Sequence, residues 1–248
     1  MLLKNKWGIV TGANRGIGYK ILETFSQHSA NIFACAREIN DDFLQKKEEL
    51  ENKYSNQIIP IKFDLSNKDV LISAVAKINE QSKQINFLVN NSAVMHNKLF
   101  QLTKMDDFYK VFEINFFNQV FFTQSLMRNF IKNKDGSIVF LSSSAAEDGN
   151  IGRSVYSSSK AALTSFAKVI SRELGTYNVR VNVISPGLIN TDMMKNSTDQ
   201  IYLENIIKEI PLRRIGETID VANLALFLVS DLSKYLTGRE IRIDGGLK

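Results

Sequence analysis

Cysteine and histidine are scarce in this chain of 248 residues. Cys35 is the single cysteine, and His28 and His96 are the two histidines. One cysteine excludes an intrachain disulfide, and these three side chains are too few for a Cys/His metal site. The same scarcity argues against chemistry that depends on a histidine base. We therefore expect no metal, and a reducing compartment, the cytoplasm.

Long apolar runs and blocks of like charge are also missing. No apolar run approaches the roughly 18 residues that a membrane-spanning helix needs, and no signal peptide precedes the first strand-like segment. The net charge of +5 is spread over the chain, with lysines next to acids at positions 45–49. A nucleic-acid-binding protein more often gathers its charge in a basic stripe. We expect neither a membrane nor a nucleic-acid partner.

What is present is a regular alternation of two kinds of segment. Short apolar or β-branched segments read as strands, at Trp7–Thr11, Asn31–Ala36, Ile58–Phe63, Phe87–Asn91, Ser137–Leu141, Val179–Ile184 and Glu240–Ile243. Segments with a period of 3.6 residues lie between them, among them Tyr19–Gln27, Asp42–Tyr54, Asp69–Gln81 and Met105–Phe130. This pattern predicts a single doubly wound, Rossmann-like α/β domain over residues 1–248. We expect a seven-stranded, mostly parallel sheet with helices on both faces.

One polar segment, Asn190–Gln200, interrupts the alternation late in the chain. Ligands of open α/β sheets lie beyond the carboxyl ends of the strands, where loops can close over them. We therefore predict a mobile substrate loop over residues 190–210.

A glycine-rich turn, Thr11–Gly18, follows the first strand and opens a helix. Glycines there permit unusual backbone angles and remove β-carbons that would block a pyrophosphate. The helix N-terminus offers free N–H groups to phosphates. A tight turn without a ligand is the alternative, but the strand–turn–helix context favours a dinucleotide site.

The second strand is followed by Arg37, where an NAD-preferring site usually has an acidic residue. Arg37 and Arg15, in the glycine turn, could grip a 2′-phosphate between two guanidinium groups. The alternative is that both arginines are merely solvated. We predict NADP(H) as the cofactor.

Asp64 follows the third strand and has two interpretations that the sequence leaves even. It could accept a hydrogen bond from the adenine amino group of the cofactor. It could equally cap the next helix, a role that Ser66 and Asn67 also suit.

The candidate catalytic residues are Ser143, Tyr156 and Lys160. The spacing of Tyr156 and Lys160 puts both side chains on one face of a helix, one turn apart. A tyrosine hydroxyl ordinarily titrates near 10, and a neighbouring ammonium group favours its ionised form. We expect Lys160 to lower the pKa of Tyr156 and so make it a usable acid or base. Ser143, at a strand end, could hydrogen-bond the substrate oxygen.

Together these motifs resemble the short-chain dehydrogenase/reductase family, and the match runs from about Lys6 to Gly246. The family's glycine turn corresponds to Thr11–Gly18, and its Ser…Tyr-x-x-x-Lys signature to Ser143, Tyr156 and Lys160. Asn115 matches the family's helix asparagine, and Pro186-Gly187 matches its Pro-Gly stretch. Four motifs in order along one chain are a specific signal.

The resemblance implies a role for each matched residue. Tyr156 would donate a proton to a ketone during reduction, and Ser143 would orient the carbonyl. Lys160 would lower the pKa of Tyr156 and hold the nicotinamide ribose, and Asn115 would anchor a water that relays protons to Lys160. An alternative for Asn115 is a capping or inter-helix hydrogen bond. The implied cofactor-binding set is Gly12, Asn14, Arg15, Gly16, Ile17, Gly18, Arg37, Asp64, Leu65, Asn91, Ala93, Tyr156, Lys160, Pro186, Gly187, Ile189 and Thr191.

The sequence departs from the family pattern after the fourth strand. Asn-Asn-Ala-Gly is expected there, whereas this chain has Ser92-Ala93 after the two asparagines. Ala93 in place of glycine implies a slightly shifted backbone beside the cofactor.

Within the family the chain is most similar to bacterial 3-oxoacyl-acyl carrier protein reductases of fatty acid biosynthesis, through segments 211–216 and 236–246. Many sugar and polyol oxidoreductases share that tail, so a sugar, polyol or other small ketone is the alternative substrate. The pair of basic residues that docks the acyl carrier protein in those reductases is half present. Lys134 occupies one of the two positions, but Tyr177 occupies the other. A non-catalytic NADP-binding sensor is a further alternative, and the retention of Ser143, Tyr156, Lys160 and Asn115 together argues against it.

The segment Met105–Phe130 contains more phenylalanine than one buried helix face requires. Either it is buried on both sides or part of it meets another subunit. The resemblance favours a subunit contact and implies a homotetramer.

Overall fold

Seven parallel strands form one sheet at the centre of the molecule. In the computed structural model, which describes residues 1–81, 83–195 and 200–247, the strand order is β3-β2-β1-β4-β5-β6-β7. Every neighbouring pair is parallel. The connection from β3 to β4 crosses back over β1, so the switch point of this doubly wound sheet lies between β1 and β4. The predicted Rossmann-like fold is confirmed.

The strands are β1 (Trp7–Thr11), β2 (Asn31–Ala36), β3 (Ile58–Lys62), β4 (Ile85–Asn90), β5 (Gly136–Leu141), β6 (Val179–Pro186) and β7 (Glu240–Ile243). The helices of eight or more residues are α1 (Gly16–Gln27), α2 (Asp41–Tyr54), α3 (Lys68–Glu80), α4 (Met105–Phe112), α5 (Asn118–Asn133), α7 (Ser154–Leu174), α9 (Gln200–Glu209) and α10 (Thr218–Val229). Shorter helical segments are η1 (Phe100–Leu102), η2 (Glu113–Phe117), α6 (Ala145–Asp148), η3 (Gly175–Tyr177), α8 (Asp192–Lys195) and η4 (Asp231–Ser233). Each predicted strand is present, with its bounds shifted by at most two residues.

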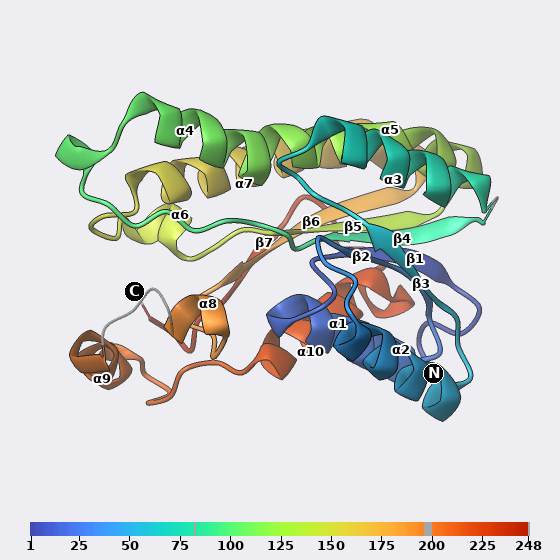
Figure 1. The fold of residues 1–248 in the computed structure, drawn as a ribbon, viewed down its shortest axis with the longest axis horizontal. Coiled ribbons are helices and arrows are strands. Elements are labelled where there is room, and N and C mark those ends of the chain that lie inside the picture. Colours follow the sequence, from blue (N-terminus) through green and yellow to red (C-terminus); the bar gives the residue numbers. More distant parts are fainter. Residues whose placement is uncertain (82, 196–199, 248) are drawn as a thin grey trace.

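Helices cover both faces of the sheet and create two separate cores. Figure 1 shows α3, α4, α5 and α7 on one face and α1, α2 and α10 on the other. Successive strand residues point to opposite faces, so Val10 packs in the α1/α10 core whereas Ile9 packs in the α3/α5/α7 core. Because both faces are covered, the central strands are buried throughout.

The segment predicted as one helix, Met105–Phe130, is instead two helices joined by a π turn. In this turn, Glu113–Phe117, the backbone N–H of Asn118 bonds to the carbonyl of Glu113, five residues earlier. π turns of this kind often occur at functional sites. The turn places Asn115 in the interior, where it is fully buried.

The polar segment after β6 contains α8 and the beginning of α9. Residues 196–199 of the predicted mobile loop lie outside the described residues, and the mobility of the loop stays a prediction. Among the described residues, no helix has both the length and the apolar character that crossing a membrane requires.

Because all strands run in one direction, their carboxyl ends lie at the same edge of the sheet. The glycine turn follows β1, Asn91 follows β4, Ser143 lies two residues after the end of β5, and Gly187 follows β6. The predicted site residues therefore converge at one edge, although they are up to 179 positions apart in the sequence.

Candidate active site

The glycine turn after β1 is packed so closely that side chains would not fit. A β-carbon on Gly18 would lie 2.0 Å from the carbonyl oxygen of Gly12 and 2.6 Å from Nδ2 of Asn91. Gly12 has a φ of +68°, which disfavours other residues. Arg15 precedes the first helical residue, Gly16, so the N–H groups of the first turn of α1 begin here. This is the cradle that a pyrophosphate needs.

The loop after β4 is attached to the same turn by Thr11. Its hydroxyl oxygen accepts hydrogen bonds from the N–H groups of Asn91 (2.9 Å) and Ser92 (3.0 Å). Nδ2 of Asn91 donates to the carbonyl of Thr11 at 2.8 Å. These bonds fix Asn91 beside the glycine turn, at the switch point where ligands of such sheets bind. Ala93 lies on the same loop, directly before Val94, to which Asn115 is hydrogen-bonded.

The two arginines predicted for the 2′-phosphate differ in their surroundings. The side chain of Arg37 is 65% exposed, and its guanidinium lies 3.9 Å from Glu38. Nδ2 of Asn14 donates to the carbonyl of Glu38 at 3.4 Å, which joins the glycine turn to the segment after β2. Arg15 is exposed at the same edge, and no carboxylate among the described residues pairs with it.

Asp64 does not cap the next helix, so that interpretation is wrong. Asn67 caps α3 by accepting hydrogen bonds from the N–H groups of Asp69 and Val70. Asp64 Oδ1 instead accepts from the N–H and hydroxyl of Ser66, at 2.9 and 2.7 Å. Partial burial acts to raise the pKa of Asp64, but the bonds from Ser66 and the charge of Arg37 outweigh burial and hold the pKa below its ordinary value. The adenine contact stays a prediction. Leu65, beside it, is buried.

The residues after β6 close the other side of the edge. The carbonyl of Pro186, the last residue of β6, accepts from the N–H of Ser144 at 2.9 Å. A β-carbon on Gly187 would lie 2.7 Å from Cβ of Asp244, so only glycine fits there. Ile189 is buried, and Thr191 caps α8 by accepting from the N–H of Met194. A β-carbon on Gly16 would lie 3.8 Å from Thr191, so this loop faces the glycine turn.

Ser143 and Tyr156 are brought together although thirteen residues separate them. The Ser143 side chain lies close enough to the Tyr156 hydroxyl to act on its pKa, and Oγ of Ser143 accepts from the N–H of Ala145 at 3.2 Å. Tyr156 lies in the first turn of α7 and is 6% exposed. Arg153, one turn earlier, lies close enough for its charge to act on the Tyr156 hydroxyl. This pair can present two hydroxyl groups to one substrate oxygen.

Lys160 is buried one turn after Tyr156. Its ammonium nitrogen donates to the carbonyl of Leu141 at 2.6 Å, at the end of β5. The same nitrogen lies 5.9 Å from the centre of the Tyr156 ring. The amine is therefore beside the ring of Tyr156, and it donates a hydrogen bond to the end of β5.

The titration of this pair differs from the expectation drawn from spacing. Burial raises the pKa of Tyr156; the Ser143 side chain and the charge of Arg153 act to lower it but do not overcome burial. Burial also lowers the pKa of Lys160 to about 7. Both shifts have one cause, the cost of burying a charged group. Within the protein alone, the expected lowering of the Tyr156 pKa by Lys160 is not what the structure gives.

Asn115 makes the inter-helix hydrogen bonds that its alternative interpretation anticipates. Its Oδ1 accepts from the N–H of Val94 (2.9 Å), and its Nδ2 donates to the carbonyl of Val94 (2.9 Å) and to Oγ of Ser159 (3.1 Å). Ser159 in turn donates to the carbonyl of Tyr156 at 2.7 Å. Asn115 thus joins the loop after β4 to the helix that bears Tyr156. Its role as a water anchor stays a prediction.

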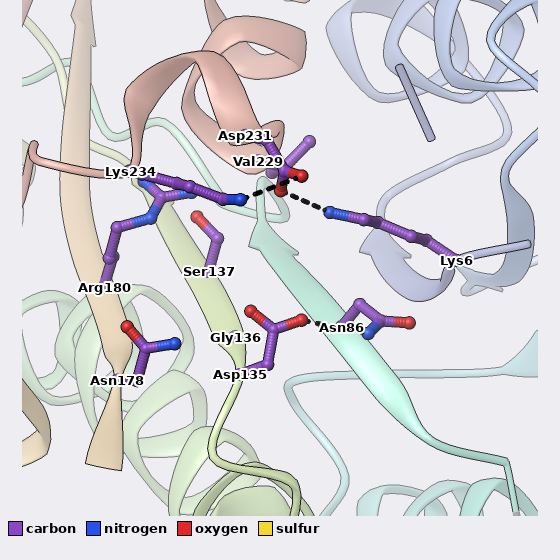
Figure 2. Close-up of a pocket in the computed structure, with 10 residues that line it drawn as sticks. All are labelled: Lys6, Asn86, Asp135, Gly136, Ser137, Asn178, Arg180, Val229, Asp231 and Lys234. Atoms are coloured by element: carbon purple, nitrogen blue, oxygen red, sulfur yellow. Dashed lines mark hydrogen bonds and ion pairs between the residues drawn. The ribbon is translucent and has the colours of Figure 1, made fainter. Parts of the chain in front are cut away.

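A polar cavity of about 90 Å³ lies at the opposite edge of the sheet, beside the amino ends of β1, β4, β5 and β6. Figure 2 shows Asp231 between Lys6 and Lys234, with ion pairs of 2.7 and 3.3 Å. Arg180 donates to Ser233 and to the carbonyls of Ser230 and Leu236. The two lysines are paired with Asp231 and the guanidinium of Arg180 is hydrogen-bonded within the chain, so we assign the cavity a structural role. Among the described residues, no group of three or more histidine, cysteine, aspartate or glutamate residues could hold a metal ion.

Sequence reasoning missed several residues of this site. Ser159, Arg153 and Gln119 match no element of the family signature, and Ser159 and Gln119 make contacts with distant segments. The signals that could have found them were position and polarity. Arg153 lies one turn before Tyr156, and Gln119 interrupts an aromatic segment.

Comparisons with known proteins extend over the whole chain. A sequence model of the family described as enoyl-(acyl carrier protein) reductase matches residues 12–248. The 3-oxoacyl-[acyl-carrier-protein] reductase FabG of Chlamydia muridarum is 34% identical over 247 residues, which cover 99% of this chain and 98% of the relative. A 3alpha-hydroxysteroid dehydrogenase of Mediterraneibacter gnavus is 31% identical over 252 residues, with 100% and 99% covered.

Solved structures show the same fold. A protein assigned as an NAD(P)-dependent gluconate 5-dehydrogenase from Beutenbergia cavernae, solved with NADP bound at low occupancy, superposes with a TM-score of 0.92 at 22% identity. A short chain dehydrogenase/reductase family protein superposes with a TM-score of 0.85 at 26% identity. Each alignment covers 99% of this chain and 98% of the other.

Proposed function

Because the chain belongs to the short-chain dehydrogenase/reductase family, we propose that it is an NADP(H)-dependent oxidoreductase that reduces a carbonyl group to an alcohol. The observation on which this depends most is the meeting of Ser143 and Tyr156 at the sheet edge that also bears the glycine turn. Two hydroxyl groups and a dinucleotide cradle at one edge are what hydride transfer to a carbonyl requires.

The protein groups fit the proposed cofactor. The absence of β-carbons at Gly12 and Gly18 lets α1 pack closely against the end of β1 and Asn91, and the first turn of α1 presents its N–H groups at this turn. Arg15 and the exposed Arg37 supply positive charge for a 2′-phosphate. When bound, NADPH supplies the hydride, and we propose that Tyr156 and Lys160 hold the nicotinamide ribose, as the resemblance implies. We propose that the remaining residues of the cofactor-binding set named above also contact NADP(H).

Tyr156 is suited to give a proton to a reduced carbonyl. Because burial raises its pKa, the phenol keeps its proton at neutral pH and can donate it to a developing alkoxide. Ser143, beside the Tyr156 hydroxyl, would hold the same oxygen. Lys160, with a pKa of about 7, can gain or lose a proton near neutral pH. We therefore propose that Lys160 takes part in returning a proton to Tyr156 after the tyrosine has donated its own.

As the substrate, we propose a 3-oxoacyl thioester, presented by an acyl carrier protein as the names of several relatives imply. The basic pair for the carrier is incomplete, since Tyr177 stands where a second basic residue is expected. The structure brings these positions together, because Asn178 Nδ2 donates to the carbonyl of Lys134 at 3.1 Å. They lie at the amino ends of β5 and β6, away from Ser143 of the same chain. A sugar, polyol or other small ketone is the alternative substrate.

We further propose a homotetramer and a cytoplasmic location. Large apolar side chains remain exposed on α4, the π turn and α7, namely Met105, Tyr109, Phe117 and Val169. The aromatic segment is thus divided, since Phe122 and Phe130 of α5 are buried in the core. An exposed apolar stripe of this kind suits contact with a second subunit. The single cysteine, Cys35, is consistent with a reducing compartment.

A substrate panel tests the proposed function. Consumption of NADPH is followed with an acetoacetyl thioester, a keto-sugar and a 3-ketosteroid as substrates. We expect the thioester to give the highest kcat/KM. A higher value for the keto-sugar would replace the acyl substrate by the alternative. No turnover with any carbonyl would favour the non-catalytic sensor.

Replacing Tyr156 tests the proposed proton donor. Tyr156→Phe removes one hydroxyl group and keeps the ring packing, so we expect kcat to fall at least about 10³-fold while NADPH binding, measured by fluorescence titration, stays within about 2-fold. Phe166→Tyr, elsewhere on α7, is a control for altered aromatic packing. Turnover that survived Tyr156→Phe would show that another group donates the proton.

A further inference from the structure

Gln119, on α5, is a buried polar residue that no part of the proposed mechanism uses. It is 1% exposed and lies in an aromatic segment of the chain. Its Nε2 donates at 3.0 Å to the carbonyl of Ser92 and at 3.0 Å to the carbonyl of Asn115. The first carbonyl belongs to the loop after β4, and the second to the π turn. One side-chain amide therefore spans two segments that border the active site.

The orientation of this amide follows from its partners. Both hydrogens of Nε2 point to carbonyl oxygens, which only accept hydrogen bonds. The reversed amide would place Oε1 against these two oxygens and repel both. Oε1 of Gln119 is buried, and no donor among the described residues bonds to it. Because a buried acceptor without a donor costs free energy, this oxygen calls for a water molecule.

The contacts of Gln119 continue to the catalytic helix. The backbone carbonyl of Asn115 accepts the hydrogen bond from Gln119. The side chain of Asn115 makes two hydrogen bonds to the backbone of Val94 and one to the hydroxyl of Ser159. Ser159 donates to the carbonyl of Tyr156. Gln119 thus stands at the start of a buried network that ends on the backbone of the proposed proton donor. In a low-dielectric interior, each bond of such a network is expensive to lose.

We propose that Gln119 is a positioning residue: its amide holds the π turn and the loop after β4 together, and its Oε1 binds a buried water beside Asn115. This inference rests on the proposed function for its effect on turnover. Gln119 acts through Asn115 and touches neither substrate nor cofactor. Without it, Asn115 and the first turn of α7 lose their common support, and proton delivery at Tyr156 slows.

Two replacements at Gln119 and a matched pair on the same helix test the proposal. Gln119→Met keeps the length of the side chain but removes both donors, and Gln119→Glu sets an acceptor against two carbonyls. Gln124, five residues later on α5, is exposed, so Gln124→Met and Gln124→Glu are the controls. We expect kcat to fall about 10-fold or more in the Gln119 variants, with KM for NADPH and ketone within about 3-fold.

The decisive readouts are those that a loss of folded protein would not change. The solvent deuterium isotope effect on kcat should rise in Gln119→Met, because proton delivery becomes slower than hydride transfer. The proposal is overturned if Gln119→Met matches Gln124→Met in kcat and isotope effect. It is equally overturned if kcat and Tm fall together while the isotope effect and pH profile stay unchanged.

Hydrogen exchange gives a test that needs no activity. The N–H of Val94 donates to Asn115 Oδ1, so its exchange should be faster in Gln119→Met than in wild type or Gln124→Met. A wild-type protein that turned over no carbonyl would refute the proposed function, and this exchange rate would still decide the role of Gln119. Unchanged exchange would refute that role. A high-resolution crystal structure with no water on Oε1 would refute the water site.

Discussion

At the scale of single residues, burial governs the chemistry of Tyr156 and Lys160 more than their mutual spacing. Tyr156 becomes charged when it loses a proton and Lys160 when it gains one, and removal from water disfavours both charged forms. Burial therefore raises the pKa of Tyr156 and lowers that of Lys160. The two shifts bring the neutral forms of both residues into coexistence over a wide pH range. A neutral tyrosine is the form that donates a proton.

The buried amine of Lys160 should reduce the stability of the protein near neutral pH. Its pKa is about 7 in the folded chain and 10.5 ordinarily, so between these values the unfolded state binds one more proton. The stability of wild type should then rise with pH in this window, by at most about 1.4 kcal/mol per pH unit. Lys160→Met removes this dependence. The free energy of unfolding of Lys160→Met minus that of wild type should be largest at pH 7 and should decrease toward pH 10.

Urea denaturation of both proteins without cofactor, at pH 7, 8.5 and 10, measures this difference. Lys168→Met, on an exposed part of α7, controls for the loss of a lysine from the same helix. A difference between Lys160→Met and wild type that did not change with pH would show that Lys160 keeps an ordinary pKa in the folded chain. Lys160→Met is expected to lose activity whatever its stability.

At the scale of elements, the close packing of the glycine turn depends on the absence of side chains at Gly12 and Gly18. The first turn of α1 approaches the end of β1 so closely that Gly18 almost touches the carbonyl of Gly12. The π turn has a comparable role on the other side of the switch point, since it directs Asn115 inward to Val94. Both are local departures from regular structure, and both lie where the proposed cofactor and catalytic residues meet.

Gly18→Ala should separate α1 from the turn. The added carbon would lie 2.0 Å from the carbonyl oxygen of Gly12, so the helix has to move away from β1 and from Asn91. We expect a loss of about 1–3 kcal/mol of stability and at least about a 10-fold weaker binding of NADPH, measured by calorimetry. Gly175→Ala is the control, because Gly175 has a helical φ of −58° and nothing lies within 4 Å of the added carbon. Equal NADPH affinity in the two variants would contradict a tight cradle at Gly18.

At the scale of the whole molecule, one parallel sheet brings every predicted site residue to a single edge. The opposite edge has a polar cavity in which Asp231 pairs with Lys6 and Lys234, and the outer faces of α4 and α7 retain exposed apolar side chains. The three surfaces differ in chemistry: one edge bears the candidate catalytic residues, the opposite edge has a polar cavity, and a third face has exposed apolar side chains.

The proposed assembly predicts a mass four times that of the 28.1 kDa chain in light scattering at micromolar concentration. Phe117, in the π turn, is 58% exposed and contacts the rings of Phe112 and Phe116. Phe117→Asp places a charge in this apolar face and should reduce the mass to that of a dimer or monomer. Leu232→Asp, a comparably exposed leucine at 63% on η4, should leave the mass unchanged. A monomeric wild type would refute the tetramer.

The order of the elements, the glycine turn and the Ser143–Tyr156–Lys160 signature followed from the sequence alone. These features depend on local periodicity and on neighbours within one or two turns, which the sequence records directly. Even there the bounds were incomplete, since the periodicity of Met105–Phe130 gave no sign of the π turn.

The tertiary structure decided which distant groups meet and how deeply they are buried. It assigned the cap of α3 to Asn67 and left Asp64 bound to Ser66, joined Asn115 to Val94 and Ser159, and enclosed Gln119 among carbonyl oxygens. It also reversed the expected direction of the Tyr156 pKa. Contacts and desolvation depend on residues that are far apart in the chain, and spacing along one helix contains no information about them.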